Sequence, residues 1–185
     1  TPTPTDTPKV TMTPSPTSTN TPTPTTTSTP TPTVPQSQCV AYAVHDEGYD
    51  DSNFLVIDLI TKKVGMIGEE YKDYNIEGIE LVGSNLYAVA RGNKVDGNLY
   101  RVDRNTADLT LIGNIGFSDV KSLATRNSDS TLWGWAEDKG LIKISTSGSA
   151  QLEFAHKNSD IEGLAWSSDG SKLYASAGKT LYIYE

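Results

Sequence analysis

Hydrophobic residues beyond the first 38 positions occur in short runs that alternate with polar residues and repeat along the chain. The clearest repeat places an aromatic residue among small or aliphatic neighbours. Its aromatic positions, Tyr42, Tyr87, Trp133 and Tyr174, are 45, 46 and 41 residues apart. Alternation with a period of two, rich in β-branched and aromatic side chains, is typical of strands. The pattern therefore predicts a repeated β-structure.

Other short runs repeat in step with this motif. One type follows it at 54–58, 99–103, 141–145 and 181–185, another recurs at 64–68 and 109–113, and a last type precedes it at 76–79, 120–123 and 161–164. Four strands in 41–46 residues are the repeat of a β-propeller blade. We therefore predict an all-β fold of four-stranded antiparallel blades, with repeats at approximately 38–75, 76–118, 119–160 and 161–185.

The predicted strands do not make a whole number of blades. The series opens at the second strand of one blade and ends after the third strand of another, which gives fourteen strands, or about 3.5 blades. Propellers have about four to eight blades, and unpaired edge strands favour association. We expect the native protein to continue past Glu185; the alternative is self-association, in which another copy covers the open β edges.

The first 35 residues have a different composition from the rest. They contain all ten prolines, sixteen threonines and three serines, and they cannot build a hydrophobic core. Such segments are extended, and Ser/Thr-rich segments with Pro are typical of O-glycosylated stalks. We predict a disordered or O-glycosylated stalk at 1–35 and a propeller-like domain at 36–185; an unmodified linker is the alternative. The candidate O-glycosylation sites are Thr3, Thr5, Thr21, Thr23, Thr25, Thr29, Thr31 and Thr33.

Charge and cysteine content exclude several classes of protein. Removing Lys9 and Asp6 of the stalk from the 15 basic and 23 acidic side chains leaves 14 and 22 in the second part, which carries the net charge of −8. This surface repels phosphate backbones, so we expect no nucleic-acid partner. Cys39 is the single cysteine, which excludes an intramolecular disulfide and a cysteine-based structural zinc site. No apolar run approaches 18 residues, so we expect no membrane span in this segment.

Three segments resemble known bacterial proteins. The run 161–175, IEGLAWSSDGSKLYA, resembles a blade of extracellular propellers of the YVTN-type, gluconolactonase-like and phytase-like groups, and 99–113 is similar. The stalk resembles the TPTPT linkers of bacterial cell-surface and secreted glycan-degrading proteins. These resemblances imply an extracellular or cell-surface location; they are specific for architecture and poor for activity.

Acidic side chains gather in two predicted loops of one rim, 45–53 and 69–75. We predict a ligand-binding rim at Asp46, Glu47, Tyr49, Asp50 and Asp51. Hard cations such as Ca²⁺ take oxygen ligands from acidic loops, so Asp50 and Asp51 are also candidate metal ligands. The alternative is a solvated acidic rim, because the spacing matches no defined calcium loop.

The resemblance to the gluconolactonase-like and phytase-like groups also implies metal ligands. In those groups a Glu-Gly near the start of the innermost strand helps to bind the metal, which makes Glu77 and Glu162 candidate Ca²⁺ ligands. Lys121 occupies the matching place in the intervening blade and breaks the pattern. The alternative is that the glycine allows tight packing and the glutamate faces water.

The sequence predicts a binding protein rather than an enzyme. No nucleophile and base share a recognisable motif, and His45 and His156 belong to different blades. We predict a non-catalytic binding, adhesion or structural surface module that contacts glycans or surface proteins, or forms part of a surface fibre. The alternative is a Ca²⁺-dependent propeller hydrolase of lactonase or phosphoesterase type.

Overall fold

A computed structural model describes residues 39–46, 51–92, 95–157 and 161–185, so the stalk and its candidate O-glycosylation sites lie outside the described residues. The described part forms fourteen strands. They are β1 (Val40–Asp46), β2 (Ser52–Asp58), β3 (Val64–Tyr71), β4 (Asn75–Val82), β5 (Asn85–Arg91), β6 (Asn98–Val102), β7 (Leu109–Asn114), β8 (Val120–Arg126), β9 (Thr131–Ala136), β10 (Gly140–Ser145), β11 (Ser149–Ala155), β12 (Gly163–Trp166), β13 (Leu173–Ala177) and β14 (Thr180–Tyr184).

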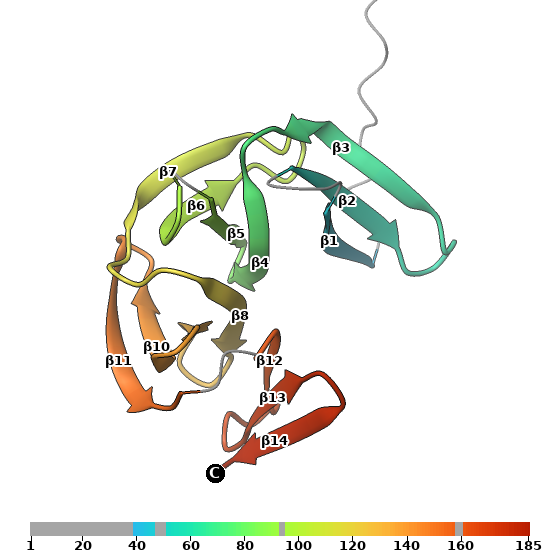
Figure 1. The fold of residues 1–185 in the computed structure, drawn as a ribbon. Helices are drawn as coiled ribbons and strands as arrows, with labels where there is room; N and C mark the ends of the chain where they lie inside the picture. Colours follow the sequence, from blue (N-terminus) through green and yellow to red (C-terminus); the bar gives the residue numbers. More distant parts are fainter. Residues whose placement is uncertain (1–38, 47–50, 93–94, 158–160) are drawn as a thin grey trace, which may run out of the picture. The chain divides into compact units, whose positions relative to one another are not determined.

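The strands form four antiparallel sheets that follow one another along the chain (Figure 1). Two sheets have four strands, in the orders β4-β5-β6-β7 and β8-β9-β10-β11. The first sheet, β1-β2-β3, and the last, β12-β13-β14, have three. The predicted all-β propeller fold is therefore confirmed, and within the described residues the first and last blades have three strands each. Among the described residues no helix is long and apolar enough to cross a membrane.

Each pair of successive sheets encloses a hydrophobic core. One core joins the first sheet to the second, and its members include Phe54 and Tyr100. Another joins the second sheet to the third, with Leu99 and Ile142 among its members. The remaining core lies between the third and last sheets and contains Trp135. Alternation along the strands explains this arrangement, because successive side chains point to opposite faces of a sheet.

Tight turns join the strands, and short polar side chains stabilise them. At the end of β2, Asp58 Oδ1 accepts hydrogen bonds from the backbone N–H groups of Ile60 and Thr61, at 2.8 and 3.0 Å. Asp103 accepts equivalent bonds at the end of β6, and Ser145 does so at the end of β10. The same turn device therefore follows the third strand of three blades.

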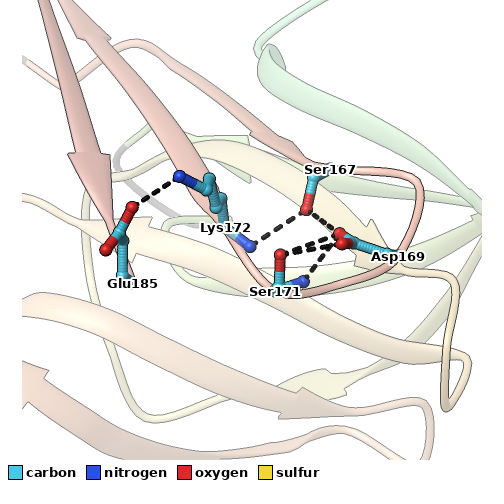
Figure 2. Close-up of polar contacts among 5 residues, drawn as sticks. All are labelled: Ser167, Asp169, Ser171, Lys172 and Glu185. Carbon is cyan, nitrogen blue, oxygen red and sulfur yellow. Dashed lines mark hydrogen bonds and ion pairs between the residues drawn. The ribbon is translucent and has the colours of Figure 1, made fainter.

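The turn between β12 and β13 uses a denser set of hydrogen bonds (Figure 2). Ser167 Oγ donates to Asp169 Oδ1 at 2.6 Å, and the Ser171 N–H donates to the same oxygen at 3.1 Å. These bonds, the one from Ser167 foremost, lower the pKa of Asp169 to about 2. Lys172 Nζ forms an ion pair with Glu185 Oε1 at 2.5 Å and so links the base of this turn to the residue after β14.

Candidate functional site

Charged side chains gather where the second and third sheets approach each other. The inner strands β4 and β8 are neighbours, and Glu77 and Lys121 lie near their starts. The antiparallel partner strands β5 and β9 end at the same edge, because Ile76 pairs with Ala90 and Val120 pairs with Ala136.

The close approach of the two inner strands depends on a glycine. A Cβ atom added at Gly78 would lie 3.1 Å from the backbone nitrogen of Leu123 and 3.2 Å from the backbone of Ser122. A side chain at this position would push β4 and β8 apart, since such distances are tighter than ordinary van der Waals contact. Glycine at position 78 thus allows the neighbouring Glu77 to approach the charges of the next blade.

Five charged side chains form the inter-blade ion-pair group, which we define as Glu77, Arg91, Asp119, Lys121 and Glu137. Arg91 is shared between two carboxylates, with Nε 2.8 Å from Asp119 Oδ1 and Nη1 3.6 Å from Glu77 Oε1. Lys121 Nζ lies 3.5 Å from Glu137 Oε2. Donors and acceptors from two blades are thereby brought together on one surface.

The Glu77 side chain is partly buried and lies close to both cations of the group. Its Oε1 accepts a hydrogen bond from Asn75 Nδ2 at 3.0 Å. Burial raises the pKa of Glu77, and the positive charges of Lys121 and Arg91 act in the opposite direction. The Glu77 carboxylate is therefore partly desolvated and held beside two cations.

The predicted acidic rim lies only partly within the described residues. Glu47, Tyr49 and Asp50 lie outside them, and Asp46 is described only as the last residue of β1. Asp51 Oδ1 accepts a hydrogen bond from the N–H of Asp73 at 3.0 Å. This bond joins the loop before β2 to the loop before β4, the two loops that the sequence placed on one rim.

The two predicted metal ligands lie in different sheets and in different surroundings. Glu77 belongs to the ion-pair group, whereas Glu162 is exposed just before β12 and its N–H donates to the Ser176 carbonyl at 3.0 Å. No three His, Cys, Asp or Glu side chains gather to hold a metal ion in the part of the chain that the structure describes. A cation at Glu77 would compete with Arg91 and lie near Lys121, so these side chains do not fit a Ca²⁺ site there.

Four members of the ion-pair group were not singled out as site residues from the sequence: Arg91, Asp119, Lys121 and Glu137. Lys121 breaks the Glu-Gly pattern in the sequence, and the structure shows that it contributes the cation of a second ion pair. The signal available in the sequence was this alternation of charge, with Glu77, Lys121 and Glu162 near the starts of successive inner strands.

Two tryptophans and His156 serve packing. Trp133 and Trp135 are buried in the core between the third and last sheets, on the same face of β9 because they are two residues apart. The His156 ring packs against Trp135 and Phe154, with ring centroids 5.7 and 6.1 Å away.

Comparisons with known proteins support the fold. No protein-family model and no curated protein matches this chain. A solved protein of unknown function from Bacteroides thetaiotaomicron is similar, with a TM-score of 0.59 and 18% identity over 78% of this chain and 42% of that one. An auxiliary nutrient binding protein from Bacteroides ovatus has a TM-score of 0.55 and 11% identity, and the match covers 72% of this chain and 35% of that one. A chain of a nidogen/laminin complex has a TM-score of 0.57 and 12% identity, and the match covers 78% of this chain and 55% of that one.

These neighbours are β-propeller-like proteins. The chain spans less than two thirds of each of them. At such low identity the similarity shows the fold, and function has to be argued from the site.

Proposed function

We propose that this chain is a non-catalytic extracellular binding module carried on its Thr/Pro-rich stalk, and that the inter-blade ion-pair group contacts a neutral glycan. The observation that carries the proposal is the shared Arg91, which lies between Asp119 and Glu77 and is half exposed. A partly exposed guanidinium with carboxylates on both sides offers fixed donors and acceptors next to one another.

A glycan fits this chemistry better than an anionic or strongly cationic ligand. Each sugar hydroxyl donates one hydrogen bond and accepts others, so it is satisfied by a surface that presents both kinds of group. The net charge of −8 repels polyanions. Arg91 and Lys121 occupy the sites that a small cation would need.

The stalk supports the proposed location of the module. Thirty-five residues dominated by Thr, Ser and Pro favour an extended segment, which holds a domain away from its point of attachment. The resemblance of this segment to linkers of bacterial surface proteins supports an extracellular or cell-surface location, with O-glycosylation of its threonines. An adhesive or fibre-forming role would use the same arrangement.

Glycan-array screening followed by calorimetry tests the binding function. The chain should bind at least one neutral glycan, and Arg91→Met should weaken that binding at least about tenfold, because a hydrogen bond to a charged group contributes about 1.5–3 kcal/mol. The matched control is Arg104→Met, which removes an exposed arginine in the turn between β6 and β7. Loss of binding in both variants, or in neither, would contradict the assignment of the site.

A further inference from the structure

The first and last sheets each present one face that no described residue covers. Side chains that point toward the next sheet in the chain lie on the forward face of a sheet, and those that point toward the previous sheet lie on its backward face. The three hydrophobic cores each join a forward face to a backward face. The backward face of the first sheet and the forward face of the last sheet have no such partner within the described ranges.

Equivalent leucines of the repeated motif differ in exposure between the last sheet and the sheets before it. Leu99, Leu141 and Leu181 occupy the same position in the third strand of successive blades. Leu99 is 0% exposed and Leu141 is 9% exposed, because each packs in the core shared with the next sheet. Leu181 is 61% exposed. The position that is buried between blades at Leu99 and Leu141 is therefore exposed at Leu181, in the last described sheet.

The same face carries a second exposed apolar side chain. Ile183 lies two residues after Leu181 and is 53% exposed. The matching positions of the two complete blades hold Arg101 and Lys143, which suit water. An isoleucine at this position suits a covered surface.

The backward face of the first sheet shows the complementary exposure. Ile57 matches Val102 and Ile144, which are buried, but Ile57 itself is only half-buried. Leu55 on β2 matches Tyr100 and Ile142, which are also buried, but Leu55 is only half-buried. This face is apolar and lacks the sheet that covers its counterparts.

We propose that two copies of this chain associate head to tail, the forward face of the last sheet of one copy packing on the backward face of the first sheet of its partner. The contact continues an interface that the chain already forms three times between its own sheets. Two copies of four sheets give eight, which is within the range of closed propellers. A head-to-tail contact that closes gives a ring, and one that does not close gives a filament.

Sedimentation velocity of the full 185-residue chain, from about 1 to about 100 µM, tests this association. The weight-average mass should rise from the 20.0 kDa of one copy to at least twice that value. The Leu181→Lys/Ile183→Lys variant and the Leu55→Lys/Ile57→Lys variant should each remain monomeric. Leu111→Lys is the control, since Leu111 is 57% exposed on β7 of a complete blade; it should associate like the unmodified chain.

Mixing the two monomeric variants distinguishes head-to-tail contact from other modes. Each variant keeps one intact face, so the mixture should form a one-to-one complex that neither variant forms alone. Circular dichroism should show that each variant keeps its β-structure, because the altered side chains lie on faces that no described sheet covers. If the lysines unfold the first sheet, the milder Leu55→Ser/Ile57→Ser variant provides the same test. An unmodified chain that stays monomeric at about 100 µM would overturn the proposal. So would a single variant that still dimerises, or a mixture that remains monomeric.

Discussion

Leu99→Ala tests the packing between blades most sharply. Leu99 is fully buried between the second and third sheets, in a core with Tyr87, Ile142 and other apolar residues. Truncation of such a leucine removes buried methyl and methylene groups and leaves a cavity, which costs about 2–5 kcal/mol in the free energy of unfolding. We expect about 3 kcal/mol, because the cavity would lie between two sheets tied by their inner strands.

The assay is urea unfolding followed by tryptophan fluorescence, at a concentration at which the chain is monomeric. With a denaturant slope of about 2 kcal/mol per M, the midpoint should fall by about 1.5 M. Leu111→Ala in the same sheet is the control, because Leu111 is half exposed and its truncation should cost about 0.5 kcal/mol or less. Equal midpoints for the two variants would refute the assignment of Leu99 to an inter-blade core.

Three further predictions concern the inter-blade ion-pair group, the close approach of β4 and β8, and the turn between β12 and β13. Lys121→Met should raise the pKa of Glu77 further, because it removes a cation that opposes the effect of burial; NMR titration of the Glu77 side-chain carboxyl measures this. Gly78→Ala should destabilise the fold by about 1–3 kcal/mol in thermal unfolding, since the added Cβ meets the backbone of β8. Ser167→Ala should raise the pKa of Asp169 from about 2 toward its ordinary value, which NMR titration of Asp169 detects.

The signs of the two pH effects are opposite. The folded-state pKa of Asp169 is depressed, so its contribution to stability is present above the unfolded value near 3.8 and is lost as the pH falls through about 2. The folded-state pKa of Glu77 is raised, so its contribution is present at low pH and is lost as the pH rises through that value.

Each of these predictions has an outcome that would count against it. An unchanged pKa of Glu77 in Lys121→Met would show that Lys121 does not act on this carboxyl. Gly65→Ala is the control for Gly78→Ala, because a Cβ at Gly65 would meet only Val56 at an ordinary 3.8 Å; equal losses would contradict the close approach of the inner strands. An unchanged pKa of Asp169 in Ser167→Ala would show that the Ser167 hydroxyl does not cause the low pKa of Asp169.

The blades could be predicted from the sequence because their signals are local. Strand β10 runs over Gly140–Ser145, and the motif placed it at 141–145, since alternation and turn residues act over a few neighbouring positions. The repeat also revealed that the first and last blades were incomplete. Leu99 is buried because a further sheet follows its own, and Leu181 is exposed because no described sheet follows the last one.

The ion-pair group could not be predicted in the same way. Arg91 ends β5, and its partner Asp119 lies in the loop before β8, so their contact depends on how two blades pack. Charge type and position in the blade were visible in the sequence, but the distance between neighbouring inner strands was not. That distance depends on Gly78, which the sequence offered only as one of two interpretations of the Glu-Gly pair.

Mapping of bound glycan by NMR tests the proposed binding site most directly. Amide resonances of the isotope-labelled chain are followed while a neutral glycan found by array screening is added. The largest shifts should fall at 75–78, 90–92, 119–122 and 136–138, the segments that carry the inter-blade ion-pair group. Shifts centred elsewhere, for example on the groove of about 410 Å³ between Ser130 and Gln151, would contradict the assignment of the site.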